Sequence, residues 1–343
     1  MRFRTMQQLV ELCERENKSI GRLMLEEQAK ESGKDEQEQF RKMAEYYAIM
    51  KEAVHKGLTE DTTSRSGLTG RDAQRVKQYM EHNEAAVGDV AAEAMANALA
   101  VSEVNASMGR IIATPTAGSC GIIPGVFVSS QKRFGWDDDT MTYALFAAGA
   151  IGFVIANNSF VSGAEGGCQA EVGSAIGMAA GAMTELRGGT PAQAAHAVGL
   201  ALKNTLGLIC DPVGGLVEVP CIVRNGFGAV NALAAADMAL AGVRSVIPSD
   251  EVIQVMLEVG TSMPEKHRET AKGGLAQTPT GQKIMDQLYR KGAPKQKSGE
   301  SARKGAEGAG IAGGAMAETE QGAAAASGTG AETADAGAGK PTS

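Results

Sequence analysis

Residues 140–164 read TMTYALFAAGAIGFVIANNSFVSGA and contain no charged side chain. A run of this length could span a bilayer, but it holds three glycines and four serines or threonines besides the Asn157–Asn158 pair. No strong basic flank fixes an orientation in a membrane, and helices that are apolar on every face also lie inside globular helical domains. We therefore predict a buried helix of a globular domain at this position.

Helix-forming patterns precede this central stretch. Residues 1–100 are rich in Glu, Lys, Gln and Met, and runs of β-branched residues are scarce. Breaks in the helical pattern fall near Ser19, near Gly33 and over residues 59–70. The N-terminal part is therefore predicted to be a series of helices.

Two capping patterns mark helices that follow the central stretch. Thr190 and Pro191 supply an N-cap and a first-turn proline for a helix over 192–207. The sequence Ser249-Asp250-Glu251 opens a helix over 252–260 in a similar way. Between the predicted helices lie loops rich in glycine and proline, at 113–125, 162–167, 210–220 and 272–281. The predicted fold is all-α, with unusually elaborate loops.

The C-terminal part has a different composition. From about residue 291 the sequence consists mainly of Ala, Gly, Glu, Lys, Ser and Thr, which cannot bury enough apolar surface to offset the entropy of ordering. We predict a helical domain over 1–290 and a disordered, low-complexity tail over 291–343. Gly308, Gly310 and Gly313 in this tail satisfy G-x-G-x-x-G, but no strand precedes them, and we interpret the match as chance.

Overall composition narrows the class of protein. The chain has 343 residues, a formal net charge of -7 and five cysteines. The negative charge does not favour nucleic-acid binding through a basic surface, and residues 1–17 have no hydrophobic run typical of a signal peptide. Free or metal-bound thiols are typical of a reducing compartment. We expect a cytoplasmic protein that binds neither nucleic acid nor membranes.

The cysteines are the residues most suggestive of chemistry. Cys13 follows the apolar rhythm of a predicted helix and is predicted to be a buried, inert thiol. Cys120, Cys168, Cys210 and Cys221 all lie in or beside glycine-rich loops, where the backbone can approach a metal-bound sulfur closely. Cysteine is also simply a small residue that fits tight packing, so spacing alone leaves both interpretations open.

Four strings, in order, carry a resemblance to a known family. They are TPTAGSCGIIPG from 114, SGAEGGCQAEVGSA from 162, CDPVGGLVEVPCIVRNGFGAVNA from 210 and KGGLAQTPTGQ from 272. The chain resembles the iron-sulfur-dependent L-serine dehydratases (L-serine ammonia-lyases), specifically their α chain, from Met1 to about Leu288. The resemblance implies an α-chain catalytic domain over 1–290 and a lyase that degrades L-serine to pyruvate and ammonia.

That resemblance also implies a cofactor. Family members hold a 4Fe-4S cluster on three cysteines, and their spacing falls on Cys168, Cys210 and Cys221. Three protein thiolates leave one iron free to act as a Lewis acid on the substrate hydroxyl. Some single-chain relatives end in a cysteine that caps this iron, whereas this chain has no cysteine after Cys221. A β chain is an expected partner and an oligomer the expected assembly.

Substrate contacts are expected mainly from the loop that begins at Thr114. Its hydroxyls and glycine-flanked amides suit an anion, although a purely structural turn is the alternative. Residues predicted to contact substrate are Thr114, Thr116, Ser119, Cys120, Gly121, Ser66 and Lys272. No residue is assigned as the general base, which the β chain could instead provide.

Three other functions compete with the dehydratase. An L-cysteine desulfidase would use the same cysteines on a thiol substrate, and a cluster-based sensor would use them without catalysis. A pyridoxal-phosphate dehydratase needs a Schiff-base lysine beside a glycine-rich phosphate cup, and Lys203 has no such cup in the sequence around it. Comparing the turnover of L-serine, L-threonine and L-cysteine would separate the dehydratase from the desulfidase.

Overall fold

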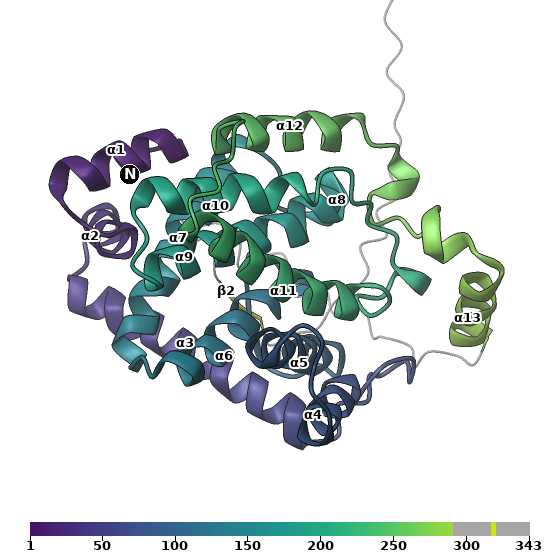
Figure 1. Cartoon of the computed structure of the whole chain (residues 1–343). Coiled ribbons are helices and arrows are strands. Elements are labelled where there is room, and N and C mark those ends of the chain that lie inside the picture. The colour runs from purple at the N-terminus through teal and green to yellow at the C-terminus, as the bar shows by residue number, and fades with distance from the viewer. Residues whose placement is uncertain (291–316, 320–343) are drawn as a thin grey trace, which may run out of the picture.

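Three helices from the N-terminal segment cover one side of the computed structural model, which describes residues 1–290 and 317–319 (Figure 1). These helices are α1 (Met6–Glu16), α2 (Ile20–Ser32) and α3 (Glu36–Thr59). Ser19 caps α2 by accepting a 3.1 Å hydrogen bond from Arg22 N, and Gly33 ends it with a φ of 66°. Both predicted breaks are therefore confirmed.

The N-terminus of α1 is capped by Thr5 and also by a side chain from a distant helix. Asp250 lies in α12 (Ser249–Ser262), and its carboxylate accepts hydrogen bonds of 2.7 Å from Met6 N and 2.9 Å from Gln7 N. The expected capping role of Ser249 is wrong, because α12 begins at Ser249 and Pro248 occupies its N-cap position without a side-chain bond. Asp250 instead joins two helices that are far apart in sequence.

Replacing Asp250 with alanine should lower the free energy of unfolding by about 1–2 kcal/mol, because two amides of α1 lose their acceptor. Urea denaturation measures this change. Glu251→Ala is the matched control, since Glu251 is the exposed next residue of the same helix and bonds to nothing in α1 within the described residues. Equal losses in the two variants would contradict the capping role.

A second group of helices packs around α5. It comprises α4 (Asp72–His82), α5 (Asp89–Ala106) and α6 (Ile122–Phe134), and α5 also contacts α3 and α11 (Cys221–Leu240). Alanines dominate α5 and allow close approach. Gly121, just before α6, lies so near this helix that a Cβ there would be 2.2 Å from Ala98 O.

The centre of the molecule is formed by α7 (Asp138–Asn158), α9 (Ser174–Leu186), α10 (Pro191–Lys203) and α11, which lie side by side in Figure 1. Residues 174–184 of α9 are all buried. In the described part of the chain, α7 is the helix long and apolar enough to cross a membrane, and 72% of its apolar window is buried. The prediction of a buried helix is confirmed. So is the cap at Thr190, which forms a capping box with Gln193.

Short elements and loops occupy one end of this helical core. They are the one-turn helix α8 (Gly163–Gly166), the π-turn η2 (Gln169–Gly173), and the 3₁₀ turns η1 (Ala117–Ser119), η3 (Val213–Gly215), η4 (Glu265–His267) and η5 (Gly274–Gln277). Helix α13 (Pro279–Arg290) follows at the edge of the molecule (Figure 1). The predicted glycine-rich loops thus meet at one place.

Two short strands are the exception to the all-α prediction, which is otherwise confirmed. β1 (Ile111–Ala113) pairs antiparallel with β2 (Ala317–Thr319). β2 falls within the segment predicted to be a disordered tail, and its three residues pair with the buried strand that contains Ile111 and Ile112. The rest of that segment, including the glycines at 308, 310 and 313, lies outside the described residues.

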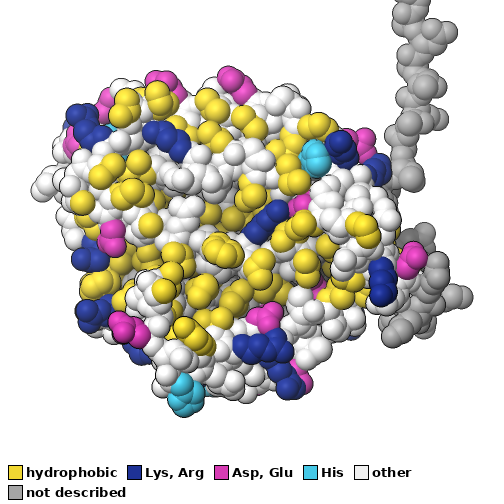
Figure 2. Space-filling view, turned by 45° about the vertical axis from the view of Figure 1, so that its right-hand side comes forward, with side chains coloured by type: hydrophobic (Ala, Val, Ile, Leu, Met, Phe, Trp, Pro, Cys, Tyr) yellow, Lys and Arg dark blue, Asp and Glu magenta, His cyan; other side chains and the backbone are white. Residues whose placement is uncertain are grey.

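One face of the molecule exposes apolar side chains. Figure 2 shows hydrophobic side chains gathered over the centre of a face, with charged ones mostly around them. On α11, Val223 is 48% exposed and Phe227 is 74% exposed, in the turns directly after Cys221. Exposed apolar patches of this kind are typical of surfaces that other proteins contact.

Candidate active site at the buried cysteines

The three cysteines predicted as ligands lie together at the loop end of the core. Cys168 immediately precedes η2, Cys210 lies between α10 and α11, and Cys221 is the first residue of α11. All three are buried and none forms a disulfide. The neighbouring Cys168 and burial raise the pKa of the Cys210 thiol, while burial and Cys168 raise that of Cys221. Their role as metal ligands stays a prediction.

Backbone contacts fix Cys210 against the loop that follows α12. Cys210 N donates to His267 O at 2.8 Å, and Glu269 N donates to Cys210 O at 2.8 Å. Glu269 has a φ of 61°, a left-handed conformation that a non-glycine residue rarely adopts. Such conformations persist where the surrounding structure imposes them, often at functional sites.

A largely buried cation lies beside these thiols. The Arg224 guanidinium donates to Asp211 Oδ1 at 3.0 Å and to Ile209 O at 2.8 Å. Burial disfavours its charge, but Cys168 and Asp211 outweigh that effect and raise the pKa of Arg224. The guanidinium therefore places a positive charge where thiolates would form.

Glu171 is one of the functional candidates that the sequence motifs did not indicate. Its carboxylate is buried and accepts a hydrogen bond from the Thr116 hydroxyl. Burial raises its pKa from 4.5 to about 7. A clue was available, since Glu171 is the one charged residue between Glu165 and Glu185. Titratable groups shifted toward neutral pH in this way are typical of acid–base sites.

The raised pKa of Glu171 predicts a pH-dependent stability. The carboxyl binds its proton more tightly in the folded state, so its contribution is complete below pH 4.5 and is lost as the pH rises through about 7. In the metal-free chain, the free energy of unfolding of Glu171→Gln should therefore rise by about 3 kcal/mol relative to that of the parent as the pH increases from 4.5 to about 7.

Urea denaturation at several pH values measures this difference. Glu165→Gln is the matched control, because Glu165 is an exposed carboxylate in the same loop region. Parallel stability curves for the parent and Glu171→Gln would contradict the shifted pKa.

The predicted substrate loop divides into two parts. Thr114 is fully buried, and its hydroxyl has no hydrogen-bond partner within the described residues, while Thr116 faces Glu171. The other part is committed to packing. Ser119 Oγ donates to Thr114 O at 2.9 Å, Gly121 N donates to Asn225 Oδ1 at 2.9 Å, and Cys120 lies in an apolar cluster with residues of α3, α5 and β1. The first part is therefore the better candidate for substrate contact.

The remaining two predicted substrate residues lie in different surroundings. Ser66 Oγ and Thr69 Oγ1 each donate to the buried Glu218 carboxylate at 2.8 Å, and Glu218 precedes Cys221 by three positions. The loop that contains Ser66 is thereby joined to the cysteine site. Lys272 instead forms a 2.7 Å ion pair with Glu265, and both side chains are more than half exposed.

Several features of the cysteine site would suit a metal cluster. Among the residues that the structure describes, no three His, Cys, Asp or Glu side chains are close enough to hold one metal ion. Free buried thiols, a nearby guanidinium and a glycine at 163, where a Cβ would lie 3.0 Å from Cys210 Sγ, all suit a cluster.

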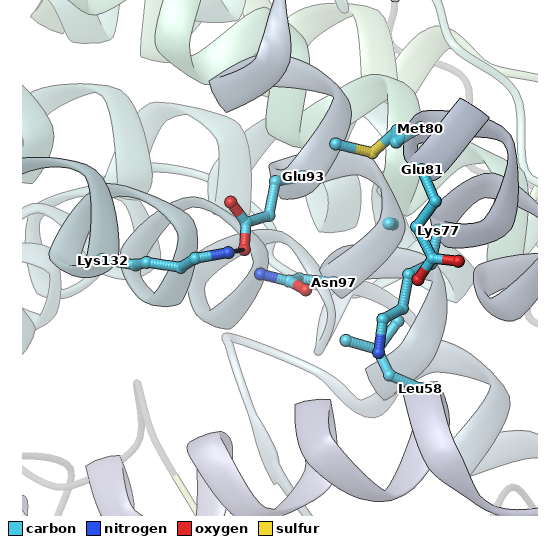
Figure 3. Close-up of a pocket in the computed structure, with 8 residues that line it drawn as sticks. Leu58, Lys77, Met80, Glu81, Glu93, Asn97 and Lys132 are labelled. Atoms are coloured by element: carbon cyan, nitrogen blue, oxygen red, sulfur yellow. Dashed lines mark hydrogen bonds and ion pairs between the residues drawn. The ribbon is translucent and has the colours of Figure 1, made fainter. Parts of the chain in front are cut away.

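A separate cavity of about 270 Å³ lies between α3, α4, α5 and α6 (Figure 3). Lys132 and Glu93 form a 2.6 Å ion pair at one wall, and the Asn97 amide points into the cavity. Lys77 and Glu81 from α4 line the opposite side. None of the lining residues belongs to the cysteine site.

Fold and site together define a helical protein with a buried centre of thiols and carboxylates. Comparison with known proteins gives the family. The model of the family described as serine dehydratase alpha chain matches residues 15–276. The chain belongs to the serine dehydratase alpha chain family.

Individual relatives agree with this assignment. The "Probable L-serine dehydratase, alpha chain" of Bacillus subtilis is 48% identical over 287 residues, which cover 84% of this chain and 95% of that protein. The "L-serine dehydratase, alpha chain" of Peptoniphilus asaccharolyticus is 43% identical over 288 residues, covering 84% and 99%. The "L-serine dehydratase" of Streptomyces coelicolor is 42% identical over 280 residues, covering 80% of this chain but 60% of that longer protein.

Proposed function

We propose that this chain is the catalytic α subunit of an L-serine dehydratase that converts L-serine to pyruvate and ammonia. The observation that carries the proposal is that Cys168, Cys210 and Cys221 lie in one site with the ionisable side chains of Glu171 and Arg224. The names of similar proteins from Bacillus and Peptoniphilus support the substrate. Residues 1–290 constitute the proposed catalytic domain.

Cys168, Cys210 and Cys221 would hold a 4Fe-4S cluster, which supplies Lewis-acid chemistry toward the substrate hydroxyl. Arg224 would offset the negative charge of the bound thiolates, as its raised pKa beside Cys168 indicates. Asp211 and Ile209 O hold this guanidinium in place. The protein thus contributes both ligands and a fixed counter-charge.

Proton transfer is proposed for Glu171. A carboxylate with a pKa near 7 can remove the α-proton of serine and release it again at neutral pH. The Thr116 hydroxyl, which donates to Glu171 Oε1, would orient it. Loss of the α-proton and the hydroxyl gives aminoacrylate, which tautomerises and hydrolyses to pyruvate and ammonia.

The test is an anaerobic reconstitution of the chain with iron and sulfide, with and without a β chain. Pyruvate release from L-serine and the visible absorbance of the cluster are followed together. Pyruvate formation that is lost on exposure to air is the expected result. A stable cluster without pyruvate in either condition would overturn the dehydratase, and turnover of L-cysteine alone would identify a desulfidase.

Assembly and location are further parts of the proposal. The α-chain names of its relatives support a β-chain partner, and the exposed Val223 and Phe227 lie directly after Cys221 on α11. The five free cysteines support a reducing, cytoplasmic location. A complex with the β chain, and oligomers of that complex, are expected on size-exclusion chromatography with light scattering.

A further inference from the structure

Two carboxylates from distant parts of the chain converge on Gly163. A Cβ at this glycine would lie 3.4 Å from Glu171 Oε2, 3.5 Å from Glu269 Oε2 and 3.0 Å from Cys210 Sγ. One point beside the Cys210 sulfur is therefore within contact distance of both carboxylates. Glycine at 163 leaves this point free of a side chain.

Each carboxylate is held toward that point by its own backbone and partners. Glu269 is fixed by the bond from its amide to Cys210 O and by its left-handed conformation. Glu171 lies on the π-turn η2, and Thr116 occupies its other oxygen, Oε1. The oxygens Glu171 Oε2 and Glu269 Oε2 both remain available on the side of Gly163.

This carboxylate pair lacks a cation of its own. Within the described residues, neither Glu171 nor Glu269 forms an ion pair, and the guanidinium of Arg224 is bonded to Asp211. Burial, and to a lesser extent the charge of Glu269, raise the pKa of Glu171, while Arg224 lowers it. Glu171 is buried whereas Glu269 is exposed to solvent, and a bound cation would relieve the repulsion between the two carboxylates.

Resting on the proposed function, we propose that Glu269 binds the α-ammonium group of the amino-acid substrate and thereby selects amino acids over hydroxy acids. An ammonium group held between Glu171 Oε2 and Glu269 Oε2, over the side of Gly163 that carries no side chain, would place the adjacent α-carbon next to Glu171. The substrate carboxylate, repelled by both glutamates, would turn toward the loop at Thr114, whose buried hydroxyl has no partner within the described residues. Glu269 is thus a specificity-determining residue, separate from the proton acceptor.

Two isosteric ligands test the proposal directly. L-Alanine and L-lactate lack the leaving hydroxyl at the β-carbon and differ at the α-carbon in carrying an ammonium or a hydroxyl group. Isothermal titration of the cluster-loaded enzyme should show a clear preference for L-alanine in the parent protein. In Glu269→Gln this preference should largely disappear, and KM for L-serine should rise on the order of 30-fold with a smaller change in kcat.

Glu265→Gln is the matched control, because Glu265 lies in the same loop but pairs with Lys272 at the surface. It should keep the parent preference and KM. Cluster absorbance and circular dichroism verify that each variant is intact. If Glu269→Gln does not fold or does not bind the cluster, Glu269→Asp is the alternative variant, because it keeps the negative charge. Glu269→Asp should bind L-alanine more weakly but still prefer it to L-lactate, and loss of that preference would overturn the proposal.

The two proposals fail in different ways. Parent enzyme that produces no pyruvate from L-serine would overturn the proposed function. Parent enzyme that produces pyruvate, with Glu269→Gln retaining both KM and the preference for L-alanine, would overturn the role of Glu269 alone.

Discussion

Cys210→Ala should reduce pyruvate formation from L-serine by more than about 100-fold, because the proposed cluster loses one of three protein ligands. Bound iron and visible absorbance should fall in parallel with the rate. The side chain is buried beside Cys168. Anaerobic reconstitution followed by iron analysis and a pyruvate assay measures the effect.

Cys120→Ala is the matched control for this experiment. Cys120 is as buried as Cys210 but packs in a separate apolar cluster with residues such as Val101 and Ile111. The variant should retain iron and most of its activity. Full iron loading and activity in Cys210→Ala, or their loss only in Cys120→Ala, would contradict the assignment of ligands.

Arg224→Met should destabilise the metal-free chain by about 3–5 kcal/mol, since it leaves the Asp211 carboxylate buried without its cation. The side chains of Arg224 and Asp211 are only 16% and 3% exposed, and their 3.0 Å contact is therefore poorly screened by water. Asp211 would keep one hydrogen bond, from Leu275 N. Urea denaturation at neutral pH measures the loss.

Arg187→Met provides the comparison for a surface pair. Arg187 lies 3.8 Å from Asp237, with side chains 36% and 74% exposed, and its removal should change stability by less than about 1 kcal/mol. Adding Asp211→Asn to Arg224→Met should restore part of the lost stability, because the unpaired charge is then gone. Equal effects of Arg224→Met and Arg187→Met would refute the buried pair.

Much of the fold could be predicted because its determinants are local. Ser19 and Thr190 act on amides three residues away, and Gly33 ends its own helix, so each is visible in a short stretch of sequence. The buried helix around 140–158 follows from its lack of charge. Asp250 could not be placed in the same way, since its partner Met6 is 244 positions away.

The site was predictable only in part, for the same reason. The residues alone left Cys168, Cys210 and Cys221 open between metal binding and packing, and the family resemblance supplied the grouping. Glu269 and Arg224 acquire their chemistry from partners on other elements, which no local pattern reveals. Lys272 is the opposite case. It lies in one of the strings that resemble the family, but its side chain forms an ion pair with Glu265 at the surface.

The isolation of Glu171 in an uncharged, buried stretch also bears on how this position can vary. A neutral side chain there should make the protein more abundant in cells at neutral pH, as it removes a carboxyl that is costly to ionise. Selection for abundance alone would therefore replace this glutamate. In a mutational scan, neutral substitutions at position 171 should raise the protein level but reduce growth on serine. This is the pattern of a residue that is retained for activity although it lowers stability.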